Sequence, residues 1–318
     1  MAAEGESRRH PASRGHTHRP DDDHGHAPAD YGAAFAIGTI LNLSFIAVEV
    51  TYGVLANSIA LVADAGHNLG DVLGLLLAWA GAVLAKRAPS RTHTYGLRRA
   101  TILAALANAM LLLVTVGAIA AEALRRLVDP GEVAGVTVMA VAAIGIAING
   151  ATALLFASGR KGDINLRAAF LHMAYDALVS LGVVAAGGAI LLTGWTVIDP
   201  LMSLTVAGVI LAGTWGLLRD STRLALDAVP AAINLDEVAA FLKAQPGIAG
   251  IHDLHIWPMS TTETALTCHC SMPGGHPGDA FLAALADQLR ERFGIGHATI
   301  QVETGAQTAC ALEPDHLV

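Results

Sequence analysis

Long apolar segments separated by short polar ones fill the first two-thirds of the chain. We predict six of them, at about 31–55, 58–85, 98–124, 133–157, 168–193 and 199–218. About 20 apolar helical residues are needed to cross the roughly 30 Å hydrocarbon core of a bilayer. No segment alternates with the two-residue period of a barrel strand, so the pattern predicts six transmembrane helices.

The pattern changes after about residue 219, where shorter amphipathic and alternating segments begin. Asn234 as a cap and Pro246-Gly247 as a stop signal delimit a helix. Strands are expected at 248–257, 263–272 and 297–303, with an amphipathic helix at 278–294 before the last strand. We therefore predict a transmembrane domain at 30–219, an α+β domain at 220–305, a polar leader at 1–29 and a tail at 306–318.

Composition agrees with a membrane protein. The 318 residues are 53% hydrophobic and 14% charged, with a mean hydropathy of +0.52. The net charge of −8 argues against a nucleic-acid partner. All three cysteines, Cys268, Cys270 and Cys310, follow the membrane domain, and we expect them to be reduced thiols.

Basic residues between the predicted spans indicate the orientation. Five of them lie between the second and third spans, and three lie between the fourth and fifth: Lys86, Arg87, Arg91, Arg98 and Arg99, then Arg160, Lys161 and Arg167. The positive-inside rule makes these loops cytoplasmic, although Arg125 and Arg126 fall on the other side. An even number of spans then places both termini in the cytoplasm, and the polar leader does not have the form of a signal peptide.

Ionisable residues recur with one spacing in two of the apolar segments. His67 and Asp71 are four residues apart in the second span, as His172 and Asp176 are in the fifth, so each pair lies on one helix face. A buried charge at mid-bilayer costs at least about 2.5–3.5 kcal/mol, which is why such groups normally face a bundle interior or a water-filled path. Together the two pairs supply two imidazoles and two carboxylates, a ligand set for a tetrahedral divalent ion such as zinc.

Other polar residues of the spans have more than one interpretation. Asp64 precedes His67 by one turn and either orients its imidazole as a hydrogen-bond acceptor or lies in water at the helix mouth. Asn42, Glu49 and Asn149 either line the same path or hold helices together by hydrogen bonds, and we favour the second.

Several motifs together resemble the cation diffusion facilitator family of zinc exporters. They are NSIALVADAGHNLGD, THTYGLRRATILAALANA, NLRAAFLHMAYDALVSLGVV, DPLMSL and IHDLHIW…HATIQVE, which together cover about residues 31–305. The resemblance implies a homodimer in which each six-span protomer carries a cytoplasmic ferredoxin-like domain and exchanges zinc for protons. It assigns the transport site to His67, Asp71, His172 and Asp176, and we expect a bacterial inner membrane.

The same resemblance implies a second metal site in the cytoplasmic domain. By motif the ligands are His252, His269 and Glu303, whereas Gln301 stands where some members have histidine. Strand alternation turns His269 away from Cys268 and Cys270. The alternative is that these are ordinary surface histidines.

We also have expectations for the tail, for one loop, for a pair of charged residues and for the leader. Cys310 and His316 could add a ligand across the dimer. His93 is the one histidine of a loop in which some members bind an additional metal, so we expect no metal there. Arg99 and Asp227 match a charge interlock of the family or are ordinary interfacial charges. The leader histidines His16, His18, His24 and His26 either collect metal or have no role.

Two other hypotheses for the function compete with metal transport. An intramembrane hydrolase would need an open position on its metal and a general base, for which Asp64 is the one candidate. A membrane-anchored metal sensor would tolerate loss of the intramembrane ligands. We expect a mixed nitrogen and oxygen tetrahedron to favour zinc, with cadmium, cobalt and nickel still possible, whereas an all-carboxylate site would favour manganese.

Overall fold

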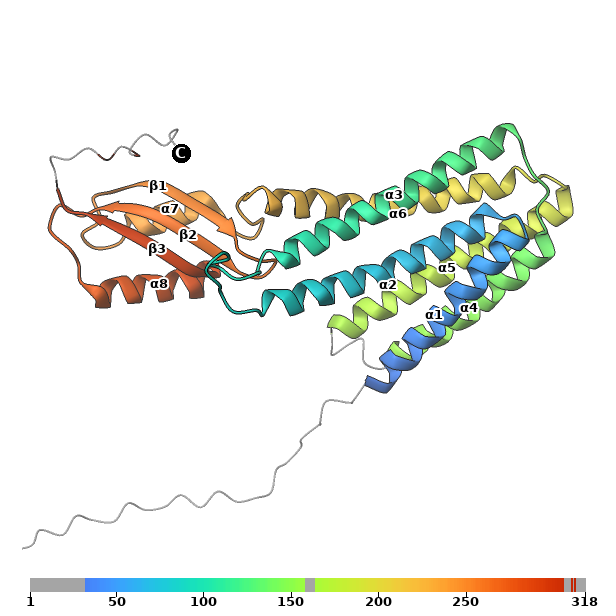
Figure 1. The fold of residues 1–318 in the computed structure, drawn as a ribbon, viewed down its shortest axis with the longest axis horizontal. Helices are drawn as coiled ribbons and strands as arrows, with labels where there is room; N and C mark the ends of the chain where they lie inside the picture. The colour runs from blue at the N-terminus through green and yellow to red at the C-terminus, as the bar shows by residue number, and fades with distance from the viewer. Residues whose placement is uncertain (1–31, 158–163, 306–309, 311, 313–318) are drawn as a thin grey trace, which may run out of the picture.

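Six helices form the membrane part of the protein, and a small α/β domain extends it at one end (Figure 1). The computed structural model describes residues 32–157, 164–305, 310 and 312. The helices are α1 Gly32–Leu55, α2 Ile59–Ala85, α3 Ala100–Val128, α4 Gly135–Ala157, α5 Ile164–Thr193 and α6 Ile198–Ala225. Within the described residues, five helices are long and apolar enough to span a membrane, and Ile40–Leu55 of α1 forms a shorter apolar helix.

The helix bounds agree with the sequence prediction except near the cytoplasmic domain. The α6 helix continues to Ala225, past the predicted end of its span at 218 and past the predicted domain boundary at 219. Its last turns carry Arg219, Asp220 and Arg223, so hydropathy falls although the helix does not end. A hydropathy pattern therefore located the end of the apolar stretch rather than the end of the helix.

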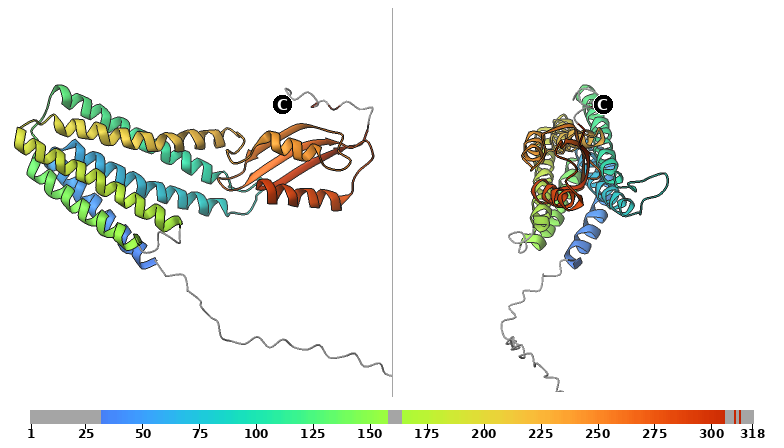
Figure 2. Two further views of the ribbon diagram at one scale, coloured as in Figure 1. Left: turned by 180° about the vertical axis from the view of Figure 1, so that it is seen from behind. Right: turned by 90° about the vertical axis from the view of Figure 1, so that its left-hand side faces the viewer.

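The α2 helix lies at the centre of the bundle. It contacts α1 and α5 on one side and α3 and α6 on the other, while α4 packs along α5 (Figures 1 and 2). Small residues allow the close approach of α3, since a Cβ atom added at Gly70 would lie 2.5 Å from Cδ2 of Leu112. Large apolar side chains on the outer surface, such as Trp79 and Leu192, are exposed in the isolated protomer and suit contact with lipid.

The start of α2 is fixed by a carboxylate from α6. Oδ2 of Asp199 accepts a hydrogen bond from the backbone N–H of Ile59 at 2.7 Å, and Oδ1 accepts one from the hydroxyl of Ser58. Ser58 is itself the N-cap residue of α2, and both polar side chains are buried. This anchor satisfies the first N–H groups of α2 where water is scarce and joins the helix that carries His67 to α6.

Replacing Asp199 by alanine should therefore destabilise the bundle. The change removes the acceptor of the Ser58 hydroxyl proton and of the Ile59 N–H, which leaves two buried donors without a partner at a cost of about 1–3 kcal/mol. Thermal unfolding in detergent should show a lower midpoint than for Asp220→Ala, a change of an exposed aspartate on the same helix. Equal midpoints for the two variants would contradict this role of Asp199.

The cytoplasmic domain has the predicted order of helix, strand, strand, helix and strand. Its elements are α7 Leu235–Lys243, β1 Gly250–Pro258, β2 Thr264–Ser271, α8 Asp279–Phe293 and β3 Ile295–Glu303. The sheet order is β1-β2-β3, with β1 antiparallel and β3 parallel to β2. As expected, Asn234 caps α7 by accepting from the N–H of Asp236 at 2.9 Å, and α8 stops at Gly294 in the left-handed region.

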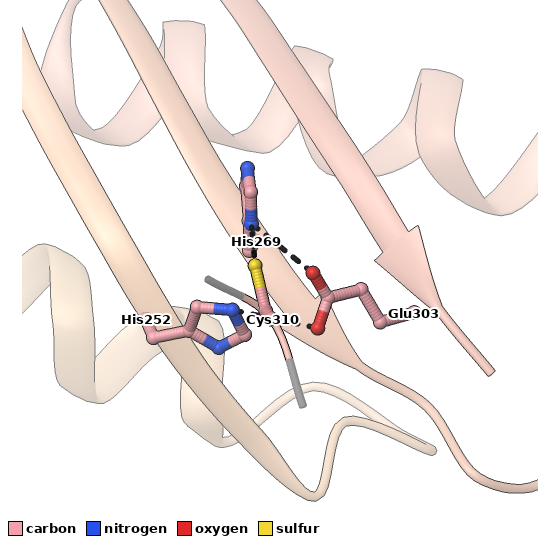
Figure 3. Close-up of side chains that lie close together, drawn as sticks. All are labelled: His252, His269, Glu303 and Cys310. Atoms are coloured by element: carbon pink, nitrogen blue, oxygen red, sulfur yellow. Dashed lines mark hydrogen bonds and ion pairs between the residues drawn. The ribbon is translucent and has the colours of Figure 1, made fainter. Parts of the chain in front are cut away.

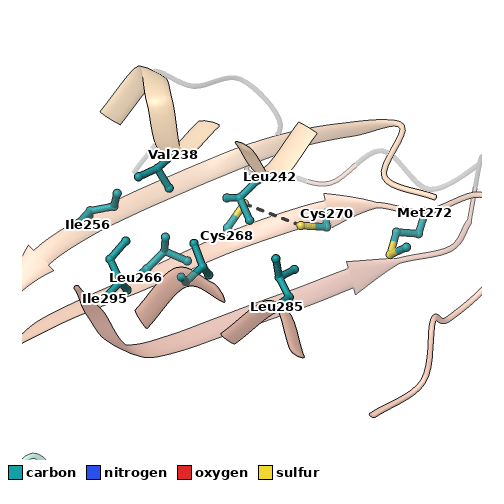
Figure 4. Packing of buried hydrophobic residues seen from close by; sticks show 10 residues of the cluster. Val238, Leu242, Ile256, Leu266, Cys268, Cys270, Met272, Leu285 and Ile295 are labelled. Atoms are coloured by element: carbon teal, nitrogen blue, oxygen red, sulfur yellow. Dashed lines mark hydrogen bonds between the residues drawn. The ribbon is translucent and has the colours of Figure 1, made fainter. Parts of the chain in front are cut away.

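Only one face of this sheet belongs to the hydrophobic core. Val238 and Leu242 of α7 and Leu285 and Leu289 of α8 pack against buried strand residues (Figure 4). Cys268 and Cys270 lie in this core, whereas His269 between them is half-buried on the opposite face, so the predicted alternation is confirmed. The face away from the helices is thus where the polar side chains of the strands gather.

The loop between α2 and α3 contacts the cytoplasmic domain directly. Arg98 pairs with Glu263, and Arg99 pairs with Asp227. The backbone N–H of Thr261 donates to Oγ1 of Thr101 at 3.1 Å. The domain and this loop therefore lie on the same side of the membrane.

Candidate metal centres

Two pairs of ionisable side chains meet between α2 and α5. His67 and Asp71 lie one turn apart on α2, and His172 and Asp176 lie one turn apart on α5. Nε2 of His67 is 3.6 Å from Oδ2 of Asp71 and 3.8 Å from Oδ1 of Asp176. Nε2 of His172 is 3.4 Å from Oδ2 of Asp71 and 3.6 Å from Oδ2 of Asp176. Each imidazole therefore faces one carboxylate on its own helix and one on the other helix.

These separations are close to those around a tetrahedral zinc ion. Zinc binds imidazole nitrogen and carboxylate oxygen at about 2.0–2.2 Å, which places neighbouring ligand atoms about 3.3–3.6 Å apart. The rings of His67 and His172 meet edge to face with centroids 6.3 Å apart. Binding of an ion would require the four groups to move closer together, because they are not all within 4.8 Å of one another as the ligand atoms of the cytoplasmic cluster are.

Burial of the carboxylates favours a cation at this position. The Asp176 side chain is 2% exposed, and Oδ2 of Asp71 and of Asp176 are both buried without a hydrogen-bond partner. Among the described residues, the ion-pair partners of both carboxylates are His67 and His172. A buried carboxylate is costly unless a cation or a proton accompanies it, so the cluster suits a divalent ion or protons.

Asp64 lies beside this cluster but points elsewhere. It is 1% exposed, so the alternative that places it in water at a helix mouth is wrong. Oγ of Ser180 on α5 donates to Oδ2 of Asp64 at 3.2 Å. Nδ1 of His67 is buried and has no hydrogen-bond partner, so the structure does not contain the orienting contact from Asp64 that the sequence suggested.

The other polar residues of the spans divide into two groups. Nδ2 of Asn68 on α2 donates to Oε2 of Glu49 on α1 at 3.3 Å, the kind of interhelical bond expected for Glu49. Asn149 on α4 is buried, and neither polar atom of its side chain has a hydrogen-bond partner. Oδ1 of Asn42 is likewise buried and unpartnered, so the expected interhelical bond is not present for the side chain of Asn149 or for this oxygen of Asn42.

A second cluster lies on the open face of the cytoplasmic sheet. His252 of β1, His269 of β2 and Glu303 of β3 stand on adjacent strands, and Cys310 of the tail lies against them (Figure 3). One ligand atom from each of the four residues lies within 4.8 Å of all the others. Oε1 of Glu303 is 3.1 Å from Nδ1 of His269, and Oε2 is 3.4 Å from Nε2 of His252. This cluster is tighter than the one in the membrane.

The electrostatics of this cluster favour an ionised carboxylate. Burial raises the pKa of Glu303, but hydrogen bonds from Cys310 and Gln301 and the proximity of His252 and His269 outweigh it, so the pKa lies below its usual range. Nε2 of Gln301 donates to Oε1 of Glu303 at 3.1 Å. Glu303 is therefore available as an anionic ligand at neutral pH.

Sequence analysis missed Asp253 at the edge of the cluster. A strict strand alternation would place it on the face opposite His252, but β1 has an irregular register between His252 and His255, and Asp253 has a φ of +51°. Its Oδ2 therefore lies 3.5 Å from Nε2 of His269. No signal in the sequence marks this bulge.

The remaining predicted positions lie apart from both clusters or outside the described residues. His93 is exposed in the loop after α2, with Nδ1 3.1 Å from Oγ1 of Thr92. His316 and the leader histidines His16, His18, His24 and His26 lie outside the described residues. Cys268 and Cys270 are free cysteines buried in the core.

Comparison with known proteins finds matches for both the membrane part and the cytoplasmic domain of the chain. Residues 35–224 match the cation efflux transmembrane domain, and residues 230–305 match the cytoplasmic domain of cation efflux proteins. The zinc transporter ZitB of Pectobacterium atrosepticum is 35% identical over 88% of this chain and 88% of its own length. The metal cation efflux system protein CzcD of Cupriavidus metallidurans is 34% identical over 91% of this chain and 90% of its own. The cadmium, cobalt and zinc/H(+)-K(+) antiporter of Bacillus velezensis is 32% identical over 89% and 92%.

These matches cover the six helices and the sheet together, and the family consists of transporters rather than enzymes. The protein is an integral membrane protein whose fold, motifs and relatives agree with one another. The chain therefore belongs to the cation efflux family, also called the cation diffusion facilitators.

Proposed function

We propose that the protein exports zinc from the cytoplasm in exchange for protons, and that His67, Asp71, His172 and Asp176 bind the transported ion. The observation that carries the proposal is that each of the two imidazoles faces carboxylates of both helices at 3.4–3.8 Å. Relatives named as zinc transporters, and as a cadmium, cobalt and zinc antiporter, support the choice of ion. Cadmium and cobalt are then secondary substrates.

Competition between metal and proton at one site supplies the coupling. A neutral imidazole is a ligand, whereas an imidazolium is not, so His67 and His172 can hold either the metal or protons. Zinc displaces protons when the site opens to the cytoplasm, and protons displace zinc when it opens to the other side. The proton gradient then drives export without nucleotide hydrolysis.

The orientation follows from charge and from the contacts of the cytoplasmic domain. The loop that carries Arg98 and Arg99 contacts that domain, and its positive charge favours the cytoplasmic side. With six spans both termini are cytoplasmic, and the bacterial relatives favour the inner membrane. We further propose that the protein is a homodimer assembled through the cytoplasmic domain.

A regulatory metal site on the cytoplasmic sheet is the second part of the proposal. His252, His269 and Glu303 converge from three adjacent strands, and a ligand atom of each lies within 4.8 Å of the others, which supports a shared metal ion. Binding there would report the cytoplasmic zinc concentration to the dimer. The rival hypothesis, a sensor without transport, predicts that the intramembrane ligands are dispensable.

Proteoliposomes with an imposed pH gradient provide the test. Zinc added on the cytoplasmic face should enter vesicles whose lumen is acidic, and a pH indicator in the lumen should report loss of protons as zinc enters. Zinc entry should fall to the passive leak when both sides have equal pH and an equal zinc concentration. Zinc movement that leaves the lumenal pH unchanged would contradict proton exchange, and no zinc movement under any gradient would contradict transport.

A further inference from the structure

The sheet of the cytoplasmic domain supplies three ligands, one short of the four that a structural zinc ion normally has. We infer that Cys310 of the same chain is the fourth. The inference rests on the regulatory site proposed above and gives that site its donor set. It replaces the expectation that Cys310 acts across the dimer.

The position of Cys310 supports a ligand role. Its Sγ is 3.5 Å from Nδ1 of His269 (Figure 3), and it lies within 4.8 Å of a ligand atom of His252 and of Glu303. Thiolate sulfur binds zinc at about 2.3 Å and imidazole nitrogen at about 2.0–2.1 Å, so a sulfur and a nitrogen on one tetrahedral ion lie about 3.5 Å apart. The two donors therefore already stand at the separation that a shared zinc ion requires.

The two histidines present their nitrogens in a manner suited to a metal. Nε2 of His252 is buried without a hydrogen-bond partner although it lies in the cluster. His269 turns Nδ1 toward Glu303 and Cys310, and its other nitrogen, Nε2, lies 3.5 Å from Oδ2 of Asp253. A carboxylate on the far nitrogen of a ligating histidine fixes the tautomer and ring orientation. The bulge in β1 therefore makes Asp253 a positioning residue for His269.

Cys310 differs from the other two cysteines in its surroundings. Cys268 and Cys270 are both buried, and their Sγ atoms lie 4.0 Å apart. Both core cysteines point into the face covered by helices. Cys310 is partly exposed beside two imidazoles, which leaves it as the thiol that a metal in the cluster can reach.

The donor set also defines the class of ion. One thiolate, two imidazoles and one carboxylate favour zinc, cadmium or cobalt over magnesium, calcium and manganese, which prefer oxygen ligands. The membrane site has two imidazoles and two carboxylates and lacks sulfur. The cytoplasmic site should therefore bind cadmium more tightly, relative to zinc, than the membrane site does.

Cobalt(II) absorption tests the inference on the full-length protein in detergent. An Asp71→Asn, Asp176→Asn background disables the membrane site, so the signal reports the cytoplasmic one. We expect cobalt to produce the intense near-ultraviolet charge-transfer band of a thiolate ligand. Adding Cys310→Ser should abolish that band, although Cys268 and Cys270 are still present, and should weaken cobalt binding at least about tenfold. His269→Ala should also abolish it, whereas the exposed His297→Ala should not.

Absence of the band in the background protein, or its persistence after Cys310→Ser or His269→Ala, would overturn the inference. Thiol alkylation gives an independent readout, in which continued protection of the buried Cys268 and Cys270 shows that the domain is folded. Zinc should protect Cys310 from maleimide in the background protein and should fail to protect it once His269→Ala is added; equal alkylation with and without zinc in the background protein would also overturn it. Because neither measurement uses transport, zinc flux can fail while this site stands, and the site can fail while flux stands.

Discussion

An Asp71→Asn, Asp176→Asn variant should show no zinc flux above the lipid background. The change keeps the size of both side chains but removes the two negative charges that balance a divalent ion in a medium where water cannot. Loss of a residue that only orients a ligand typically costs about 10–100-fold in metal affinity, so loss of two ligands should cost at least about 100-fold. The measurement is zinc entry into proteoliposomes under a fixed pH gradient.

The control for this variant is Asp220→Asn, which removes a carboxylate from the exposed cytoplasmic end of α6. Its flux should match that of the unmodified protein. The double variant must also elute and unfold like the unmodified protein, because Asp176 is buried and a misfolded bundle would abolish flux for another reason. A correctly folded double variant that still transports zinc would exclude Asp71 and Asp176 as ligands and would mean that the transported ion binds elsewhere in the bundle.

Helical geometry explains why the membrane cluster could be anticipated from the sequence. A histidine and an aspartate four residues apart share a helix face whatever surrounds them, and burial forces that face toward another polar group. His172 and Asp176 repeat the pattern on α5, and the structure places them opposite His67 and Asp71. The spacing is a local feature of the sequence. In a membrane, a helix face that carries ionisable side chains has few places to lie other than the interior of the bundle.

Features that depend on irregular backbone or on distant parts of the chain were harder to predict. The position of Asp253 depends on a bulge, which shifts a side chain to the other face of a strand without a mark in the residue pattern. Cys310 lies seven positions after Glu303, and periodicity cannot indicate where a tail lies. Asp64 accepts a hydrogen bond from Ser180, which is 116 positions away in the sequence. The spacing between Asp64 and His67 therefore could not predict that Asp64 is buried against α5.

Exchanging one histidine of the membrane cluster for aspartate should change which metals are carried. The His172→Asp variant replaces a nitrogen donor by an oxygen donor. The side chain at position 172 is 41% exposed, so a carboxylate there costs less desolvation than a carboxylate at a buried position such as Asp176. Oxygen-rich sites favour manganese and magnesium, and imidazole favours zinc. We expect zinc flux to fall and manganese, added as a competitor, to inhibit the remaining flux at least about tenfold more strongly than in the unmodified protein.

Two matched variants separate this change of preference from simple damage. His172→Ala removes a ligand and supplies none, so flux should fall without any gain in inhibition by manganese. His93→Asp adds a carboxylate to an exposed loop and should leave both flux and inhibition unchanged. If His172→Asp and His172→Ala give the same metal preference, the residue at this position does not contact the ion, and α5 would contribute only Asp176. If the metal preference shifts in His172→Asp but not in His172→Ala, the imidazole nitrogen of His172 itself selects zinc. The two variants differ only in whether the side chain at position 172 offers a donor atom to the ion.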